Sequence, residues 1–242
     1  MEYSSGSVIG PLLTAAILKR KKPVICIVVA STTSAKEADN SVKTLQTLQN
    51  MAVNNTNGTP IPMVYFENSD NPTTEYMGKR NEIDLRIETV IRQIALLYSG
   101  NHKELDKTDL VNWLNYRNVT KDIPSQLVEV LIYKDSVDGE YNKEIDAHAG
   151  MCIGTASLLR SDTDIVPAIN QPYSAVGYYN EQVLEKGDIP NHHYIMTASR
   201  IPYIFRGLED AEHQFREAKQ TIMGAELHGV TAPSDDDTGM VF

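Results

Sequence analysis

The acidic segment at residues 104–110 carries the side chains best suited to chemistry. Its sequence, Glu-Leu-Asp-Lys-Thr-Asp-Leu, places Asp106 and Asp109 three residues apart, at the start of a short helix expected over 109–115. Two carboxylates at this spacing can orient or polarise a water molecule for hydrolysis. They can also stabilise the helix itself, with Asp106 as the N-cap acceptor and Asp109 in the favourable first turn. The residues alone leave both interpretations open.

A second candidate is the turn of small residues near the N-terminus, which includes Ser5, Gly6 and Ser7. We expect a loop over 6–11 that leads into a helix, with Pro11 in the first turn, where its missing N–H costs nothing. Unpaired backbone N–H groups at such a helix start can hold a phosphate. Ser and Gly also begin many helices that bind no ligand, so this turn by itself is a weak indication.

The bulk composition limits the classes of function. The 242 residues, 41% of them hydrophobic, suffice for one large domain or two small ones with a core of their own. The net charge of −10 argues against general nucleic-acid binding, and the short basic run at 19–22 is typical of a solvated helix end. No apolar stretch is long enough to span a bilayer and no signal peptide is present, which favours a cytoplasmic protein without membrane contact.

Metal and disulfide chemistry are not expected. The chain has two cysteines, Cys26 and Cys152, too few for a disulfide framework or a metal cluster. Cys26 lies within an apolar run, where a free cysteine acts as a small hydrophobic residue. The histidines His192, His193 and His213 lack the spacing of metal ligands.

Helix and strand patterns alternate through the first half of the chain and predict an α/β fold. The continuous apolar run at 24–30 is typical of a strand covered on both faces, and 61–66 is a second strand. Apolar residues at helical spacing predict helices over 35–52 and 82–98, the latter ended by Gly100. We expect the two strands to be neighbours in one largely parallel sheet, with helix 82–98 between two domains.

The pattern changes near 116–125, where we place a domain boundary. The second half is predicted to be an α+β domain with a mixed sheet. Its expected strands are 127–133, 147–158, 173–179 and 193–199, with a turn at 137–140 and a final helix at 208–223. The predicted organisation is a domain over 1–118 that includes helix 82–98, an α+β domain over 119–227, and an acidic tail over 228–242.

The order of these features resembles the tubulin/FtsZ superfamily. A turn of small residues leads into a helix containing a proline, then an apolar strand that ends in Ser and Thr, and later a long helix followed by an Asp-x-x-Asp loop. In that family a glycine-rich signature of the form GGGTG[ST]G binds the phosphates of GTP. The acidic loop after the long helix completes the GTPase site of the neighbouring subunit. The resemblance covers about residues 4–115.

The resemblance implies a nucleotide-binding role for two groups of residues. Ser5, Gly6 and Ser7 would match the end of the phosphate signature. Asp84, or alternatively Asn81, would lie near the guanine-contacting asparagine of the long helix. GTP and magnesium are therefore the implied cofactors of a completed site, whereas none is expected for the isolated chain.

The same resemblance implies a catalytic role for the acidic loop. Asp106 and Asp109 would match its two acidic residues, while Glu104 stands where FtsZ has asparagine. The N-terminus departs further from the family, since the signature has three glycines before its threonine and this chain has only Gly6 there. Several strands normally precede the signature, so the expected fold is a truncated doubly wound sheet with an exposed edge. Either another chain covers that edge or the fold has been rebuilt.

Two functions from different classes remain open. The first is a structural or assembly subunit that associates with itself and has no GTPase activity alone. The second is the C-terminal portion of a split GTPase whose nucleotide site is completed by a separately encoded N-terminal half. An unrelated α/β binding protein is the third alternative.

The acidic end of the chain has two interpretations. In residues 234–242, three aspartates precede the apolar residues Met240, Val241 and Phe242. The segment can be a solubilising end or a docking peptide for a partner. Phage-encoded members of the family resemble this pattern, which would place the protein in the host cytoplasm or in a virion.

Overall fold

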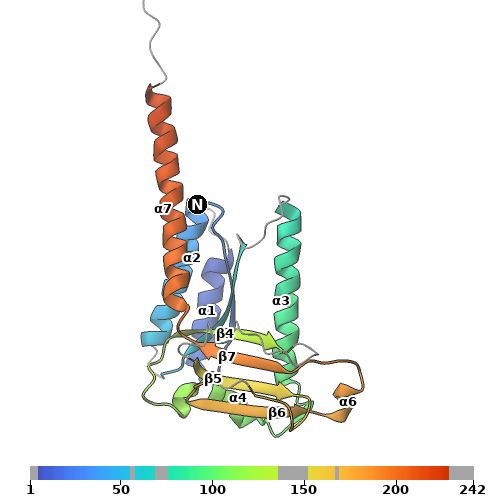
Figure 1. Ribbon diagram of the computed structural model, residues 1–242. Helices are drawn as coiled ribbons and strands as arrows, with labels where there is room; N and C mark the ends of the chain where they lie inside the picture. Colours follow the sequence, from blue (N-terminus) through green and yellow to red (C-terminus); the bar gives the residue numbers. More distant parts are fainter. Residues whose placement is uncertain (1–4, 55–57, 69–75, 136–151, 167–168, 229–242) are drawn as a thin grey trace, which may run out of the picture.

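A computed structural model describes residues 5–54, 58–68, 76–135, 152–166 and 169–228 of the chain. Its strands form one seven-stranded sheet in the order β1-β2-β4-β7-β5-β6-β3 (Figure 1). Its larger elements, in chain order, are α1 (Ser5–Lys19), β1 (Cys26–Ala30), α2 (Ala35–Asn54), β2 (Ile61–Glu67), α3 (Tyr76–Tyr98), β3 (His102–Lys103), α4 (Lys107–Leu114), β4 (Leu127–Lys134), β5 (Cys152–Leu159), β6 (Tyr173–Tyr179), α6 (Glu181–Leu184), β7 (His192–Thr197) and α7 (Ile201–His228).

The N-terminal half of the sheet is parallel. Strand β1 runs parallel to β2, with Cys26 opposite Met63, and β2 runs parallel to the first residues of β4. Helices α1, α2 and the start of α7 cover one face, where Leu45 and Leu208 belong to a single buried cluster. The prediction that segments 24–30 and 61–66 are neighbouring parallel strands is confirmed.

The C-terminal half of the sheet is mixed. Strand β4 pairs antiparallel with β7, β7 antiparallel with β5, and β5 parallel with β6, whose other edge carries the short antiparallel β3. In Figure 1 these strands run across the lower part of the molecule, at a steep angle to β1 and β2. Strand β4 belongs to both halves, because its first residues pair with β2 and its later residues with β7.

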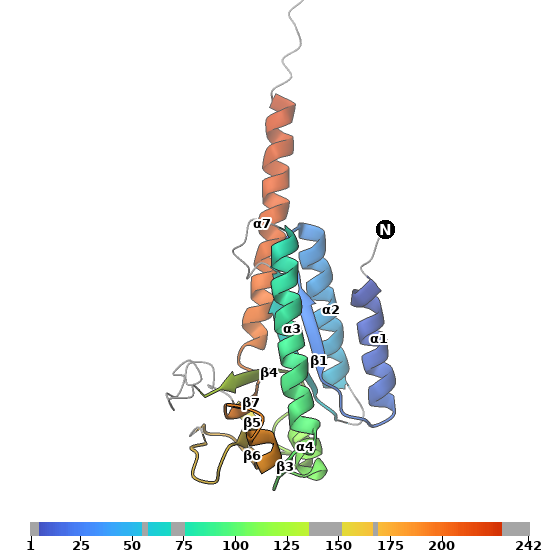
Figure 2. The ribbon, with the colours of Figure 1, turned by 90° about the vertical axis from the view of Figure 1, so that its right-hand side faces the viewer.

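Helix α3 contacts both halves of the sheet. Its residues Ile87, Val90 and Ile94 pack on the largest core cluster, which contains residues of β2 as well as of β4, β5 and β7. The hydroxyl of Tyr194 in β7 donates a hydrogen bond of 2.7 Å to the carbonyl of Gln93. Figure 2 shows α3 standing upright beside the parallel strands. The α/β class is as predicted, while the position of this helix between two domains and the boundary at 116–125 stay predictions, since one sheet runs through both halves.

Some local expectations differ from the structure, and others fall outside the described residues. The loop expected over 6–11 is helical, because α1 begins at Ser5 and contains Pro11 within it. Pro11 has no backbone N–H and therefore removes one hydrogen bond from the helix. In the same turn, the hydroxyl of Thr14 donates a hydrogen bond to the carbonyl of Gly10 at 2.9 Å. The short elements β3 and α6 were not expected at all. The predicted turn at 137–140 and the first residues of the predicted strand 147–158 lie outside the described residues.

The strand at 24–30 is not covered on both faces as expected. Cys26, Val28 and Ala30 face the core shared with α2, whereas Ile27 and Val29 remain 36% and 43% exposed on the other face. β1 is also the outermost strand, and within the described part of the chain nothing pairs with its outer edge. An apolar run predicts a strand but cannot show how many of its faces are covered.

Candidate functional site

The acidic loop forms the N-terminal cap of α4. Asp106 is the N-cap, and its Oδ1 accepts hydrogen bonds from the backbone N–H groups of Thr108 at 2.6 Å and Asp109 at 2.9 Å. In return, the Oδ2 of Asp109 accepts a hydrogen bond from the backbone N–H of Asp106 at 3.1 Å. This reciprocal capping box matches the structural interpretation of the pair. The two residues that the sequence proposed as partners do lie together.

The caps leave the Asp106 carboxylate charged and open to solvent. Its backbone hydrogen bonds, first from Asp109 and then from Thr108, hold its pKa below the usual range, and its side chain is exposed. The hydroxyl of Tyr173 donates to the Asp109 carbonyl at 3.1 Å. Burial, followed by the nearby charge of Asp109, raises the pKa of Tyr173 to about 12, so this hydroxyl stays a donor. The loop therefore presents a fixed, ionised carboxylate.

A close backbone approach positions this loop against the sheet. Leu105 is buried against β6, where a Cβ on Gly177 would lie 2.6 Å from the Leu105 Cβ and 3.0 Å from the Lys103 carbonyl oxygen. Only glycine leaves that space free. Glu104 completes the turn with a φ of 66°, in the left-handed region. The acidic loop is thus held by contacts from β6 that the sequence gave no reason to expect.

The candidate phosphate and base residues lie on other elements. Gly6 is exposed and Ser7 half-buried in the first turn of α1. Asp84 is exposed on α3. Ser5 and Asn81 lie in these same helices, but their side chains fall outside the described part of the structure. None of the described side chains among these residues contacts the acidic loop.

The two groups of candidates lie at opposite ends of the molecule. Helix α1 begins at the upper end in Figures 1 and 2, and α3 begins at the same end. Helix α4 and the acidic loop lie at the lower end, beyond the last residue of α3. With 23 residues, α3 is about 34 Å long. Asp106 therefore cannot reach a ligand held at the start of α1 in its own chain.

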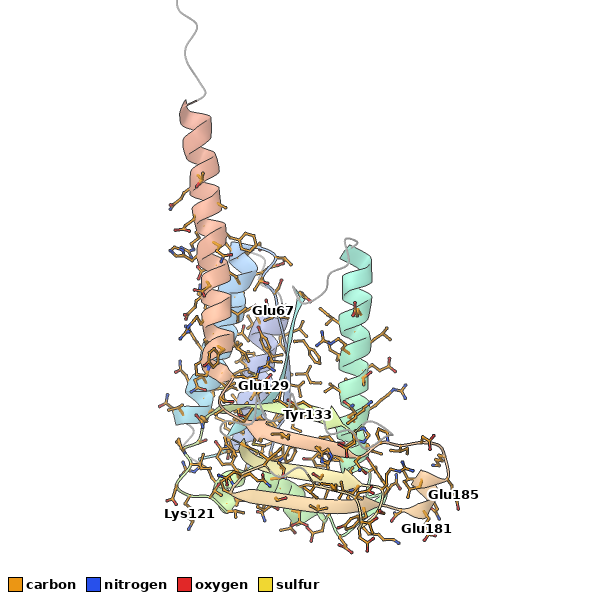
Figure 3. The ribbon with its side chains drawn as sticks, viewed as in Figure 1. Glu67, Lys121, Glu129, Tyr133, Glu181 and Glu185 are labelled. Carbon is orange, nitrogen blue, oxygen red and sulfur yellow. The ribbon has the colours of Figure 1, made fainter. Side chains whose placement is uncertain are left out.

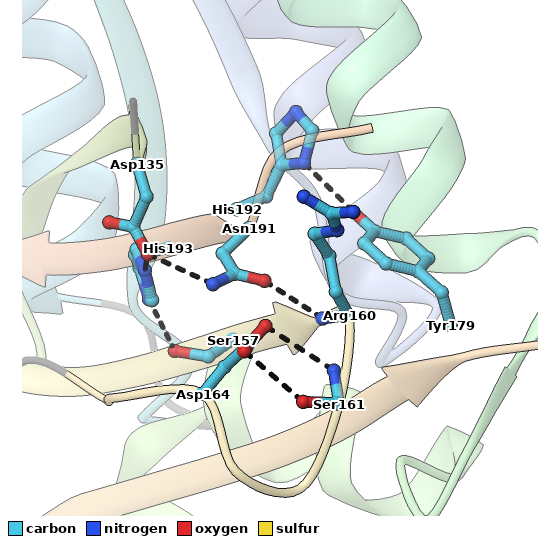
Figure 4. Close-up of polar contacts among 9 residues, drawn as sticks. All are labelled: Asp135, Ser157, Arg160, Ser161, Asp164, Tyr179, Asn191, His192 and His193. Atoms are coloured by element: carbon cyan, nitrogen blue, oxygen red, sulfur yellow. Dashed lines mark hydrogen bonds and ion pairs between the residues drawn. The ribbon is translucent and has the colours of Figure 1, made fainter. Parts of the chain in front are cut away.

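The structure assembles a Ser-His-Asp arrangement that the sequence did not reveal. The Ser157 Oγ lies 3.0 Å from His193 Nδ1, and His193 Nε2 lies 3.2 Å from Asp135 Oδ2 (Figure 4). Asn191 extends this network by donating to Asp135 Oδ2 at 3.0 Å. Ser157 is only 1% exposed within β5, so no substrate carbonyl can reach its hydroxyl. The arrangement satisfies buried polar groups and does not form a hydrolytic centre.

The adjacent His192 is held in its neutral form. Burial, followed by the positive charge of Lys134, lowers its pKa to about 4. The hydroxyl of Tyr179 lies 2.8 Å from His192 Nδ1 (Figure 4), and the neutral ring accepts this hydrogen bond. Both histidines of the sequence pair thus have internal partners. Among the described residues, no group of three or more His, Cys, Asp or Glu side chains is placed to hold a metal ion.

A cleft of about 660 Å³ lies between α3 and the start of α7, above β4. Figure 3 shows Glu67 of β2 and Glu129 of β4 on this side of the molecule. Glu129 lies almost fully buried, with Arg200 Nε 3.4 Å from its Oε2. Burial raises the pKa of Glu129 to about 7, although the charge of Arg200 opposes the shift. The sequence points to this cleft only through Glu129, a single carboxylate within the apolar strand 127–133.

Comparison with solved structures defines the class of protein. The fold matches the phage tubulin PhuZ with GDP at a TM-score of 0.77 and 22% identity, over 98% of this chain and 70% of that chain. It matches the TubZ protofilament from bacteriophage PhiKZ at a TM-score of 0.74 and 22% identity, over 98% of this chain and 69% of that one. The chain therefore has a tubulin-like fold.

Sequence relatives narrow the class. The phage tubulin-like protein of Pseudomonas phage 201phi2-1 is 26% identical over 208 residues, 86% of this chain and 61% of the relative. That of Pseudomonas phage phiKZ is 25% identical over the whole of this chain and 68% of the relative. No family model matches the sequence. The chain is thus similar in sequence to phage tubulin-like proteins, and it spans 61% of the length of the first of these relatives.

Proposed function

We propose that the chain is a tubulin-like structural subunit that assembles head to tail and does not turn over GTP by itself. The observation that supports this function is the separation of its candidate residues. Asp106 and Asp109 lie at the end of the molecule opposite the start of α1. An ionised carboxylate in this position can act only on a ligand that a neighbouring chain holds at its other end. Repetition of such a heterologous contact builds an open filament.

The relatives support assembly in this manner. One solved relative is a filament of PhuZ201 and another is a protofilament of TubZ from bacteriophage PhiKZ. Their subunits share the fold of this chain over 98% of its length. We infer that this chain associates with copies of itself, so that the acidic loop of one copy meets the start of α1 of the next. The relatives are phage proteins, which makes the cytoplasm of an infected host the proposed location.

The residues described fit only part of a nucleotide site. The first turn of α1 offers backbone N–H groups near Gly6 and Ser7, which suit one edge of a phosphate. Phosphoryl transfer also needs a metal and contacts to the other phosphates. The described side chains offer no cluster of metal ligands. This donor set does not by itself fit a GTP–magnesium complex, so the proposal includes weak or absent GTP binding by the chain alone.

A split GTPase is the second candidate function, and the surface around β1 favours it. Ile27 and Val29 are exposed on one face of this outermost strand. Helix α1, which packs on the opposite face of this strand, exposes four more large apolar side chains on its outer side, namely Val8, Ile9, Leu12 and Leu13. A second polypeptide that covers this surface would extend the sheet and supply the missing phosphate contacts. Asp106 and Asp109 would then act in trans on the completed site.

The acidic tail fits a docking role in the proposed assembly. Helix α7 extends well beyond the other elements (Figures 1 and 2), and its residues from His213 to Thr221 are exposed. The C-terminal end of this helix therefore lies away from the body of the chain. We propose that residues 234–242 bind a neighbouring subunit. Deletion of these residues should weaken assembly without lowering the stability of the monomer.

The test of assembly is sedimentation and electron microscopy of the purified full chain over a range of concentrations, with and without GTP. We expect concentration-dependent polymers or oligomers, and we expect Asp106→Arg to weaken them by reversing the charge at the lower end. Asp210→Arg on α7 is the matched control, because it reverses the charge of another exposed aspartate outside the lower end. A compact monomer at all concentrations, also when mixed with a phage tubulin-like relative, would reject the assembly function.

GTP hydrolysis by the same samples separates the two candidate functions. The structural subunit predicts no turnover by the chain alone. The split GTPase predicts turnover only after addition of the completing chain, with loss of activity in Asp106→Ala or Asp109→Ala. Rapid turnover by the chain alone, abolished by either substitution, would reject both and make this chain an enzyme in its own right.

A further inference from the structure

The cleft between α3 and α7 has the size and walls of a small-molecule site. Its volume of about 660 Å³ suits a drug-sized ligand. Phe66 of β2, Val90 of α3 and Ile204 of α7 contribute apolar surface from three sides. Glu129 and Arg200 lie among these walls. The cleft thus combines apolar walls with a few polar groups, which is the usual composition of a ligand pocket.

Glu129 is the polar group in this cleft whose bonding is incomplete. Its side chain is 3% exposed, and its Oε2 has no hydrogen-bond partner in the described part of the chain. The Arg200 Nε forms an ion pair with this Oε2 at 3.4 Å but no hydrogen bond, and the Arg200 side chain is itself partly exposed. Buried carboxylate oxygens nearly always accept hydrogen bonds, so an exception indicates a missing partner.

The other charged groups around the cleft are better satisfied. Glu67 accepts hydrogen bonds from the Thr32 hydroxyl at 3.0 Å and the Tyr65 hydroxyl at 3.2 Å. The guanidinium of Arg86 lies 5.3 Å from the centre of the Phe66 ring. Glu82 is exposed to solvent. Among the described charged groups of the cleft, Glu129 is therefore the one that lacks a hydrogen-bond donor for its Oε2.

The charge balance favours a cationic donor over a neutral one. Three carboxylates and two guanidinium groups line the cleft, so its ionisable groups carry a net negative charge when all are ionised. A charge-assisted hydrogen bond is also about twice as strong as a neutral one. A buried carboxylate without such a partner lowers the stability of the folded chain, and costs of this kind are characteristic of binding sites.

We propose that this cleft binds a small organic cation, whose N–H donors pair with the Glu129 carboxylate and whose apolar body packs on Phe66, Val90 and Ile204. The site lies apart from the acidic loop and from the start of α1, and the proposal does not depend on the assembly function. An amidine or a primary amine carried on an aromatic ring has the required chemistry.

Benzamidine is the probe for the first test, with titration calorimetry and methyl NMR on the full chain. We expect saturable binding, with shift changes at Val90 and Ile204. Glu129→Gln keeps the shape of the side chain but removes its charge, and it should weaken binding at least about tenfold. Glu185→Gln, at the C-cap of α6, makes the same change far from the cleft (Figure 3) and should leave binding unchanged. Benzyl alcohol, a neutral analogue, should bind the wild-type chain more weakly.

A second variant tests the location without altering Glu129. Gly207 lines the cleft, and a Cβ added there meets no atom within 4 Å, so Gly207→Leu adds bulk to the wall of the cleft without a clash at the Cβ. We expect this variant to fold and to lose benzamidine binding. Binding that survives both Glu129→Gln and Gly207→Leu would overturn the proposal. Absence of saturable binding to the wild-type chain, or equal binding of benzyl alcohol, would overturn it as well.

The pH dependence of binding provides an independent readout. Affinity for benzamidine should rise between pH 6 and pH 8 as Glu129 ionises, since its pKa is about 7. The other charged groups that face the cleft are Glu67, Glu82, Arg86 and Arg200. The rise should disappear in Glu129→Gln. A rise of equal size in that variant would show that another group controls binding and would reject the assignment to Glu129.

Discussion

The two halves of the sheet differ in how completely the chain covers the apolar faces of their strands. In the C-terminal half, every residue of β5 and β7 is buried, and the histidines at the start of β7 have hydrogen-bond partners within the fold. In the N-terminal half, β1 exposes Ile27 and Val29, and α1 exposes further apolar side chains. In β4, at the junction of the two halves, the Oε2 of the buried Glu129 lacks a hydrogen-bond partner among the described residues.

This difference separates residues that maintain the fold from residues available for binding. Exposed apolar surface and unsatisfied buried groups both lower the free energy gained on folding, so they are informative where they occur. The polar network around Ser157 and His193 resembles a catalytic site in its distances, yet its groups satisfy one another and are inaccessible. The N-terminal surface and the cleft are incomplete in the described structure. These two regions are where partners or ligands are to be sought.

The largest expected effect compares a leucine from each region. Leu158 in β5 is 0% exposed, and Leu158→Ala should lower the free energy of unfolding by about 2–5 kcal/mol, because it leaves a cavity in the core. Leu12 on α1 is 65% exposed, so Leu12→Ala should change stability by less than about 0.5 kcal/mol. Urea unfolding followed by circular dichroism measures both. Equal losses would mean that α1 is already covered in solution and would break the comparison.

An intermediate effect concerns acid stability and His192. Its folded pKa of about 4 lies below the ordinary value of 6.5, so the unfolded chain takes up the proton first as pH falls. The contribution of this group is fully present above pH 6.5, and about 3 kcal/mol should be lost between pH 6.5 and pH 4. His192→Gln retains an acceptor for the Tyr179 hydroxyl and should flatten this part of the stability curve. An unchanged acid slope in the variant would contradict the assignment.

The smallest expected effect has the opposite sign and concerns Glu129. Its folded pKa of about 7 lies above the ordinary value of 4.5, so the unfolded chain releases the proton first as pH rises. Stability due to this group is therefore lost between pH 4.5 and pH 7. Glu129→Gln should stabilise the chain by about 1–2 kcal/mol at pH 8, less than the full shift because Arg200 loses its partner. Thermal unfolding at pH 5 and pH 8 measures this, and a variant that is less stable at pH 8 would show that Glu129 serves the fold.

Much of the secondary structure could be predicted from local patterns. The helix at 82–98 and the strands at 61–66 and 127–133 were confirmed, because apolar periodicity depends on neighbours in sequence. The two-residue strand β3 could not be predicted, since it exists only through its pairing with β6. The helical turn at Ser5–Pro11 was also missed, since a proline was expected to mark a helix start.

The candidate site was predicted in part. Asp106 and Asp109 lie together because a capping box is a local motif that four consecutive residues suffice to form. Their orientation at the end opposite the start of α1 required the whole length of α3 and the close approach of Leu105 to Gly177. The cleft at Glu129 joins residues from β2, α3, β4 and α7, and no spacing in the sequence connects them.

The sequence by itself determined the elements, their alternation and the resemblance to tubulin, because these follow from periodicity, capping and the order of motifs along the chain. Only the tertiary structure decided which polar groups are satisfied and which remain open. Ser157 and His193 are 36 residues apart in sequence and meet across two strands, whereas Glu129 lies in an equally apolar strand and has no hydrogen bond to its Oε2. Burial and hydrogen bonding between distant residues depend on packing, which no local pattern encodes.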